Sequence, residues 1–501
     1  MVVSMLPRAS AALQAAVFTA RKRGMGTGRA GGKAQEKSGG KSGNFVFSPL
    51  SVLLVFAVAM RGARGRTVAE MEHLLPLREV PALLRLTSHS SRPSSNTESE
   101  SEETEDRRRE VKFEVVTGMY VDGRLAGNTY FQAFKDELLQ ELSNGDQRNQ
   151  KLPVHLIDCN NPYETARDIN AFVSRATRGH ITDLASPDLI TPLTRLLMIS
   201  AAFFKGAWFT PFRESETDKA PFNALLYPDP SMEHESNEGN EGREQKSEEE
   251  RSDQPPFITE SEPRPVVQHV DTMHVLLKPP AEFYIRVDDA VTAVGLPYLD
   301  EDYVMYVVQP NDPKNLEKLM RFHAEESAVD GFPTFEDVVQ SMREGQEETE
   351  NVEAYVSLPR FALKASDNYV DMIPLFQRLL RIQAPFDPRV ADFSGISGDR
   401  TLLMSAFVHQ AEIEVDEKGT LATAASLGAI AVRTAFRPMK RVNITVDGAF
   451  VFQIRYYPRN EGLAHGQGKA SERGAAATGG PVVGEYILFS GCVTDALAAQ
   501  Q

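Results

Sequence analysis

Residues 412–433 read EIEVDEKGTLATAASLGAIAVR. Residues 412–417 have the composition of a β-strand, and Gly419 follows them with the backbone freedom that a hinge requires. The residues after Gly419 are mostly small and include no proline. We therefore expect a strand, then a hinge, then an extended segment of small side chains.

The small segment has a second property, which appears when it is written as an extended strand. Alternate side chains of a strand share one face, and here that face is small and uncharged. A segment of this kind can slip between two existing strands without a steric clash or a buried charge. By composition alone, however, a flexible alanine-rich linker is the simpler interpretation. The residues that share the face are Thr420, Ala422, Ala424, Ser426 and Gly428.

The patterned segments around this stretch indicate an α+β fold. The run from Leu196 to Phe204 is almost unbroken in apolar residues, which is typical of a strand buried on both faces. Helical patterns come first along the chain, at 53–60 and 163–178, and strands dominate later. Strands are expected at 111–122, 291–296, 303–308, 450–456 and 486–489.

Four low-complexity segments interrupt this pattern, and no new folding unit follows any of them. They cannot bury enough apolar surface to offset their ordering entropy, so we expect disordered insertions within a single domain, residues 1–501. Most of the net charge of −16 lies in acidic runs, which argues against nucleic acid or a membrane surface as a partner. The expected insertions are 24–43, 89–110, 228–266 and 459–482.

The sequence contains no pattern that assembles a catalytic or metal-binding site. The Gly26–Gly31 string matches G-x-G-x-x-G but follows no strand, and H-E-x-x-H and paired C-x-x-C motifs are missing. We expect no catalytic residues, no metal and no cofactor. His409 lies in an apolar stretch, where a hydrogen-bonded core histidine is expected. Cys159 and Cys492 are expected to be free thiols, with a disulfide between them as the alternative.

The first residues indicate a helix that belongs to the fold. Leu13, Ala16, Val17 and Ala20 recur at helical spacing, and no clean apolar block with a cleavage site precedes them. A signal peptide and a mitochondrial transit peptide are the alternatives. We therefore expect a cytoplasmic or unconventionally secreted protein, and an extracellular location is the alternative.

Further strings occur in an order that matches one known family, and they span nearly all of the chain outside the insertions. They are residues 44–51 (NFVFSPLS), 169–173 (INAFV), 177–181 (TRGHI), 203–208 (FFKGAW), 296–298 (LPY), 358–361 (LPRF) and 391–396 (ADFSGI). In this order they resemble the serpins, a family of protease inhibitors. The resemblance implies a single α+β domain with about nine helices, three β-sheets and an exposed reactive-centre loop at about residues 417–441.

The resemblance also gives the opening stretch a role. Glu417-Lys-Gly-Thr420 is similar to the family's proximal hinge, with Lys418 departing at a position that should face solvent. In inhibitory serpins the bait residue lies sixteen positions after the hinge glutamate, which implies Arg433 and the reactive bond Arg433–Thr434. Arg437 is the competing bait, but Pro438 follows it.

Two structural clusters are implied as well. Ser48, Ser51, Ser200 and His409 resemble the shutter, a hydrogen-bonded cluster beneath the sheet, although Ser200 stands where the family usually has asparagine. Trp208 resembles the breach, where the loop first enters the sheet.

The implied function is suicide inhibition of a trypsin-like serine protease, held as a covalent acyl complex by a monomeric inhibitor. A non-inhibitory serpin that acts as chaperone, carrier or storage protein is the alternative from a different class. Inhibition of cysteine proteases is a third interpretation. Asn443-Ile-Thr445 is a glycosylation acceptor string, for which chance occurrence is the simpler reading.

Overall fold

The computed structural model of the protein describes ten stretches of the chain. Most of the four expected insertions, the Gly26–Gly31 string and residues 421–438 lie outside them. Five of the expected site residues therefore lie outside the described residues, namely Ala422, Ala424, Ser426, Arg433 and Thr434. The described stretches are 6–23, 41–86, 111–142, 153–227, 263–279, 283–321, 331–345, 351–420, 439–458 and 485–500.

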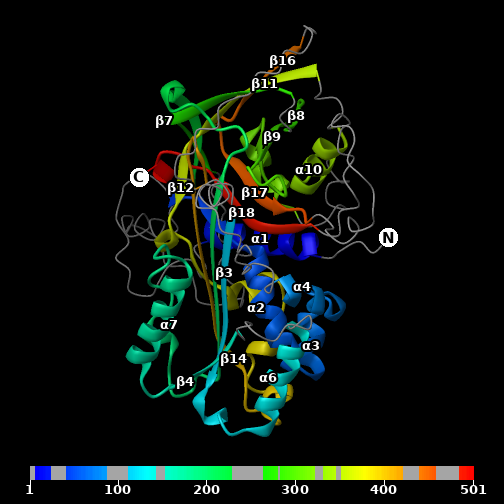
Figure 1. The fold of residues 1–501 in the computed structure, drawn as a ribbon, viewed down its shortest axis with the longest axis vertical. Helices are drawn as coiled ribbons and strands as arrows, with labels where there is room; N and C mark the ends of the chain where they lie inside the picture. The colour runs from blue at the N-terminus through cyan, green and yellow to red at the C-terminus, as the bar shows by residue number, and fades with distance from the viewer. Residues whose placement is uncertain are drawn as a thin grey trace, which may run out of the picture.

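A seven-stranded sheet runs parallel to the long axis through the middle and lower parts of the molecule (Figure 1). Its two long central strands, β14 (Met404–Val415) and β5 (Leu196–Ala207), run parallel and pair directly over most of their length. The short strand β15 (Gly419–Thr420) lies between them at one end. The other members are β12 (Phe361–Leu363) and β13 (Tyr369–Asp371) on the β14 side, and β3 (Lys112–Asp122) and β4 (Val154–Ile157) on the β5 side.

Two smaller sheets complete the β-structure of the described residues, and the five-stranded one reaches the upper end of the molecule in Figure 1. The six-stranded sheet has the order β2 (Phe45–Phe47), β18 (Tyr486–Val493), β17 (Phe450–Tyr456), β10 (Tyr303–Pro310), β9 (Val291–Pro297) and β8 (Tyr284–Val287). The five-stranded sheet has the order β1 (Lys41–Ser42), β6 (Asp218–Tyr227), β7 (Arg264–Leu277), β11 (Val352–Pro359) and β16 (Lys440–Thr445).

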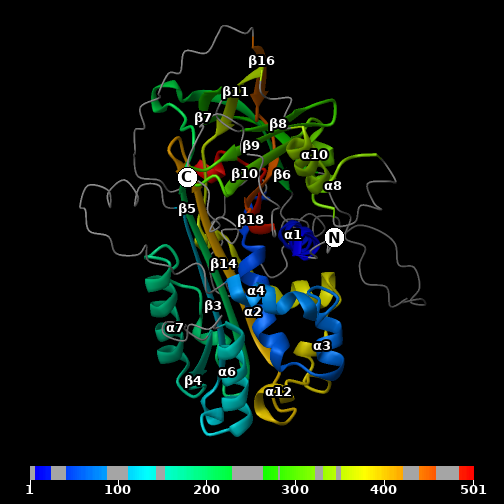
Figure 2. The ribbon, with the colours of Figure 1, turned by 45° about the vertical axis from the view of Figure 1, so that its right-hand side comes forward.

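The described residues contain ten α-helices, one more than the number expected. Figure 2 shows α7 on one face of the central sheet and α2 and α3 on the other. The helices are α1 (Leu6–Lys22), α2 (Pro49–Gly62), α3 (Gly65–Met71), α4 (Val80–Leu86), α6 (Thr129–Leu142), α7 (Pro162–Ala176), α8 (Leu316–Leu319), α10 (Phe335–Glu344), α11 (Met372–Pro374) and α12 (Ser394–Ser397).

Strand β5 is apolar over most of its length because it faces hydrophobic core on both sides. Ile199 and Ala201 pack into the cluster beneath α7, whereas Met198 and Phe204 pack into the larger core on the opposite face. A strand covered on both faces needs no polar alternation. The expectation of a doubly buried strand at 196–204 is confirmed, and the strand continues to Ala207.

Several other expectations are confirmed. The N-terminal helix is α1, in which Leu13, Ala16, Val17 and Ala20 are buried. The strand expected at 111–122 is β3, which begins at Lys112 and ends at Asp122. Both cysteines are free and buried. The three sheets agree with the expected α+β class.

Some boundaries differ from the expected ones. The strand expected at 412–417 is β14, which begins at Met404 and ends at Val415. It ends there because the Asp416 carboxylate accepts hydrogen bonds from the amides of Lys418 and Gly419, which turns the chain back. Residues 41–42 and 264–266, expected inside insertions, pair with β6 as parts of β1 and β7. Residues 440–441, expected in the loop, begin β16.

A buried arginine joins several of these elements. The Arg455 side chain on β17 has no exposed surface and lies 3.0 Å from the Glu336 carboxylate on α10. It also pairs with Glu485, just before β18, and donates a 2.9 Å hydrogen bond to Gln453. Gln453 in turn bonds to Gln14 of α1. Burial alone would raise the pKa of Glu485, but the charge and hydrogen bond of Arg455 hold that pKa below its ordinary value.

Replacement of Arg455 should therefore destabilise the fold strongly. Arg455→Ala leaves Glu485 partly buried without its cation, and breaking a buried ion pair in this way costs about 3–5 kcal/mol. The midpoint of denaturant-induced unfolding measures the loss. The matched control is Arg441→Ala, which removes a mostly exposed arginine 3.4 Å from Glu353 and should cost about 0–1 kcal/mol. Equal losses in the two variants would contradict the role assigned to Arg455.

Candidate functional site

The candidate site is the hinge segment, residues 416–420, at the end of the central sheet where β15 lies. Gly419 pairs with Ala207 and Thr420 pairs with Gly206 of β5, both antiparallel. On the other side Thr420 pairs with Val415 of β14. Gly419 and Thr420, which the resemblance placed in the exposed reactive loop, therefore already form a short central strand of the sheet.

The turn before β15 is held by Trp208, the last residue of the FFKGAW string, and by Phe212 just after it. The Trp208 indole nitrogen donates a 2.9 Å hydrogen bond to the Asp416 carbonyl, and the Trp208 amide donates to the Lys418 carbonyl at 3.0 Å. The Phe212 amide donates to the Glu417 carbonyl at 2.8 Å. Lys418 extends outward, as expected from its charge, and lies 2.9 Å from Glu214.

Glu417 is the buried anion of the hinge segment. Its carboxylate accepts a 2.8 Å hydrogen bond from Arg360 and another from Thr217. Burial opposes the ionisation of Glu417, but the bonds from Arg360 and Thr217 outweigh it and hold the pKa of this carboxyl below its ordinary value. Glu417 therefore stays ionised and ties the hinge segment to the start of β12.

Gly419 and Thr420 fit their positions for different reasons. Gly419 has φ +151°, and a Cβ atom there would lie 2.1 Å from the Gly206 carbonyl oxygen, so the position requires glycine. Thr420 is fully buried on the core face, where its hydroxyl lies 2.7 Å from the Tyr298 hydroxyl. The Tyr298 ring stacks on Trp208 with their centroids 4.7 Å apart.

The structure brings Ser48, Ser51, Ser200 and His409 together farther along the sheet; we call them the Ser–His cluster. The Ser48 amide donates to His409 Nε2 at 3.0 Å, so Nδ1 carries the ring proton and donates to Ser200 Oγ at 3.0 Å. Ser200 Oγ lies 2.9 Å from Ser51 Oγ, which donates to the Ser48 carbonyl at 3.1 Å. Serine at position 200 thus completes a closed network in place of the expected asparagine.

The Ser–His cluster lies where β5 and β14 pair directly, since His409 is the register partner of Ser200. All four side chains have no exposed surface, and burial lowers the pKa of His409 to about 3. The imidazole is therefore a neutral core histidine, as expected. Its two hydrogen bonds connect β14 to Ser200 of β5 and to Ser48 at the start of α2.

Two residues at the site were overlooked in the sequence. Tyr298 and Arg360 belong to the LPY and LPRF strings, but nothing in those strings indicates that they bind Thr420 and Glu417. The signal that could have found Arg360 is the need of a buried hinge glutamate for a cation.

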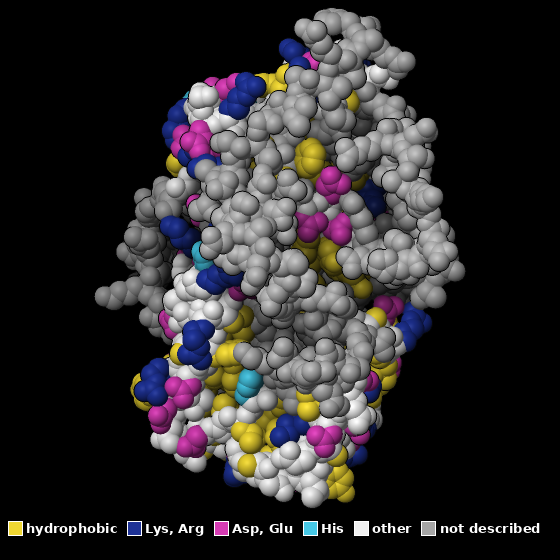
Figure 3. Space-filling model, in the orientation of Figure 1, with side chains coloured by type: hydrophobic (Ala, Val, Ile, Leu, Met, Phe, Trp, Pro, Cys, Tyr) yellow, Lys and Arg dark blue, Asp and Glu magenta, His cyan; other side chains and the backbone are white. Residues whose placement is uncertain are grey.

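Among the described residues, no three His, Cys, Asp or Glu side chains gather closely enough to hold a metal ion. No helix in the described part of the chain is both long and apolar enough to cross a membrane. Figure 3 shows basic and acidic side chains interspersed over the described residues of the lower half of this face.

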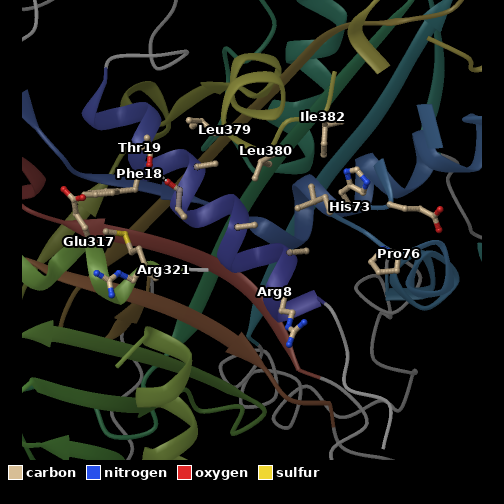
Figure 4. Close-up of a pocket in the computed structure, with 17 residues that line it drawn as sticks. Arg8, Phe18, Thr19, His73, Pro76, Glu317, Arg321, Leu379, Leu380 and Ile382 are labelled. Atoms are coloured by element: carbon tan, nitrogen blue, oxygen red, sulfur yellow. Dashed lines mark hydrogen bonds between the residues drawn. The ribbon is translucent and has the colours of Figure 1, made fainter. Parts of the chain in front are cut away.

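A pocket of about 710 Å³ lies elsewhere, along one side of α1 (Figure 4). Arg8 and Thr19 of α1 line it, together with Glu317 of α8 and with Leu379, Leu380 and Ile382. None of its lining residues belongs to β5, β14 or β15, so we assign it no part in the hinge.

Comparisons with known proteins agree on one family. The family model described as Serpin (serine protease inhibitor) matches residues 33–229 and 245–467. Leukocyte elastase inhibitor A of Rattus norvegicus is 25% identical over 423 residues, 83% of this chain and 90% of that protein. Serpin B6 of Pongo abelii is 26% identical over 423 residues, 84% of this chain and 91% of that protein.

Solved structures show the same fold. The structure of Serpin48 of the insect Tenebrio molitor has a TM-score of 0.60 at 20% identity and covers 99% of each chain. Tengpin, a thermophilic serpin in its native state, has a TM-score of 0.57 at 16% identity, with coverage of 99% of this chain and 95% of that one.

The neutral His409 predicts how stability depends on pH. In the unfolded chain the His409 imidazole takes up a proton as the pH falls below its ordinary pKa of about 6.5. In the folded chain the same imidazole stays neutral until the pH falls to about 3. Stability contributed by His409 is therefore present above pH 6.5 and is lost as the pH falls, by at most about 1.4 kcal/mol per unit.

Thermal unfolding midpoints between pH 4 and 8 measure this slope. His409→Gln should flatten it, whereas His269→Gln on the exposed surface of β7 should leave it unchanged. If the glutamine variant does not fold, titration of the wild-type imidazole by NMR replaces it. Protonation of His409 above pH 5 would contradict the assignment.

Proposed function

The chain belongs to the serpin family, and from this premise we propose that it is an inhibitory member that traps trypsin-like serine proteases. The observation that carries the proposal is the position of β15, paired with β5 on one side and β14 on the other. A chain that enters a sheet between its two central strands can extend the new strand by continuing the same pairing. The uncharged, proline-free run after Thr420 supports such an extension.

The proposed reaction starts at the bond between Arg433 and Thr434. The serine hydroxyl of the protease attacks the Arg433 carbonyl, the peptide bond breaks, and the amine of Thr434 leaves with the proton that the protease histidine supplies. An ester then joins Arg433 to the protease. The freed segment inserts between β5 and β14 before water hydrolyses this ester, which carries the attached protease along the sheet and leaves the covalent complex trapped.

Insertion is favourable because each inserted residue forms ladder hydrogen bonds with two strands. A net gain of about 0.5–1.5 kcal/mol per hydrogen bond adds up over a strand of ordinary length. The uncleaved protein is then kinetically trapped and not at its free-energy minimum. The hydrogen bonds of the hinge segment and the Ser–His cluster belong to this barrier.

Specificity in this proposal comes from Arg433. A bait arginine fits a protease whose specificity pocket holds a carboxylate, and a hydrogen bond to a charged group contributes about 1.5–3 kcal/mol. Several curated relatives are leukocyte elastase inhibitors, but at 25% identity their targets do not transfer to this chain. Arg437 is the weaker candidate because Pro438 follows it.

The remaining parts of the proposal concern organisation. We propose one domain over residues 1–501, interrupted by insertions, and a monomeric inhibitor with no catalytic activity. The second candidate function is a non-inhibitory serpin that acts as chaperone, carrier or storage protein. A protein of that class is cleaved in the loop without trapping the protease.

Mixing the purified protein with trypsin tests the proposal. Denaturing electrophoresis should show a covalent complex, and mass spectrometry should find a released C-terminal fragment that begins at Thr434. Arg433→Ala should abolish the complex with trypsin and leave the fold intact, because the specificity pocket loses its cation. Arg437→Ala is the matched control and should still form the complex. Cleavage before Thr434 without a complex would favour the non-inhibitory function.

A second prediction concerns the buried face of the hinge segment. Thr420→Arg places a charge at a fully buried position beside Tyr298, which should displace β15 from the sheet. Insertion then loses the strand from which it continues, so it should slow and the protein should become a substrate of trypsin. Thr420→Val keeps the size and the neutrality and should still inhibit. The number of inhibitor molecules consumed per trapped protease measures the change. Equal values for the two variants would refute the assignment of this face.

A further inference from the structure

The central sheet contains a fork, where direct pairing of β5 and β14 gives way to β15. The last directly paired residues are Phe203 and Glu412. Beyond this pair the two strands diverge, and Gly419 and Thr420 fill the space between them. Any further insertion has to begin by separating Phe203 from Glu412.

The His180 side chain contacts both strands at the fork. Its ring stacks on the Phe203 ring, with the centroids 3.9 Å apart and the planes inclined by 15°. Its Nδ1 atom lies 3.0 Å from the Glu412 carboxylate. Glu412 also accepts a 3.2 Å hydrogen bond from the Ala365 amide, which ties it to the β12 and β13 side of the sheet. His180 therefore bridges the two halves of the sheet.

The backbone after α7 places His180 in this position. Arg178 has φ +53° and Gly179 has φ +87°, so two left-handed residues end the helix and turn the chain over the sheet. The Gly179 amide closes the helix end by donating to the Ser174 carbonyl at 2.8 Å. The neighbouring Arg178 lies 2.6 Å from Glu114 of β3, which anchors the same segment to the β5 side alone.

The pairing register brings the inserting chain to the same place. Gly419 pairs with Ala207 and Thr420 pairs with Gly206 of β5. If an inserting strand continues this antiparallel pairing, the third residue after Thr420 lies opposite Phe203. On the other side, Thr420 pairs with Val415 of β14. The same continuation places the third residue, which is Thr423, opposite Glu412. An odd spacing from Thr420 puts that side chain on the opposite face, toward α7, where His180 lies.

We propose that His180 is a positioning residue that latches β5 to β14 at the fork and limits the rate of loop insertion. This inference rests on the proposed inhibitory function. Separation of the strands breaks either the stack on Phe203 or the hydrogen bond to Glu412. The latch thus adds to the barrier that the inserting strand has to cross at the third residue after Thr420.

The rate of insertion after loop cleavage tests the latch. The only tryptophan of the chain, Trp208, bonds to Asp416, so its fluorescence in a stopped-flow experiment with trypsin reports movement of the hinge segment. His180→Ala should speed the insertion phase about five- to thirty-fold, the range expected for one or two lost contacts. His180→Phe keeps an aromatic stack but no hydrogen bond and should also be faster than the wild type.

Two controls separate a latch from a general loosening of the structure. Arg178→Ala removes an anchor of the same segment that does not cross the fork, and it should leave the rate near the wild-type value. His155→Ala removes a similar stack, with the His155 and Tyr120 centroids 4.9 Å apart, from the outer strand β4. It should lower the thermal stability of the native and cleaved forms equally without changing the rate.

A double-mutant cycle tests the pairing itself. Glu412→Ala should speed insertion as His180→Ala does, and the double variant should be no faster than either single variant. Additive effects, or a His180→Ala rate equal to that of the wild type or of Arg178→Ala, would overturn the latch.

Amide hydrogen exchange of the uncleaved protein tests the latch independently of whether the protein inhibits a protease. His180→Ala should speed exchange at residues 201–204 and 410–413, and Arg178→Ala should not. A wild-type protein that gives no insertion signal refutes the inhibitory function, and the exchange data then decide on the latch alone. Unchanged exchange in His180→Ala would overturn it.

Discussion

The parallel register between β5 and β14 is the constraint on which the rest of the structure depends. The two strands pair directly from Leu196 and Met404 at one end to Phe203 and Glu412. Their direct pairing ends there, and the short strand β15 lies between them over the remaining residues. Because β15 occupies that end, the sheet is one strand wider there than below. The hinge segment, the fork and the Ser–His cluster are successive positions along this one seam.

Polar contacts hold the seam at each of these positions. Arg360 binds Glu417, Tyr298 binds Thr420, His180 binds Glu412, and His409 binds Ser200. Buried polar groups are costly when they lack partners and nearly neutral when they are paired. A seam closed in this way resists opening as long as its bonds stay intact, and it can exchange them for bonds to an incoming backbone at little net cost. This behaviour is what the proposed insertion requires.

The apolar periodicity of the sequence predicted well the helices and strands that bury a continuous face. The apolar run at 196–204, the strands near 291–296 and 303–308, and the N-terminal helix were predicted because their periodicity reflects burial directly. The histidine at 409 was expected in the core for the same reason. Ser48, Ser51 and Trp208 were found through motif strings, and the structure places the two serines in the cluster with His409.

The sequence by itself determined the α+β class, the buried strands and the neutral, small character of the segment after Gly419. Only the tertiary structure decided that Gly419 and Thr420 lie inside the sheet, that Arg360 neutralises Glu417, and that His180 spans the fork. The physical reason is the range of the interactions. Burial leaves a periodic trace in neighbouring residues, whereas a bond between residues more than two hundred positions apart, such as His180 and Glu412, leaves none.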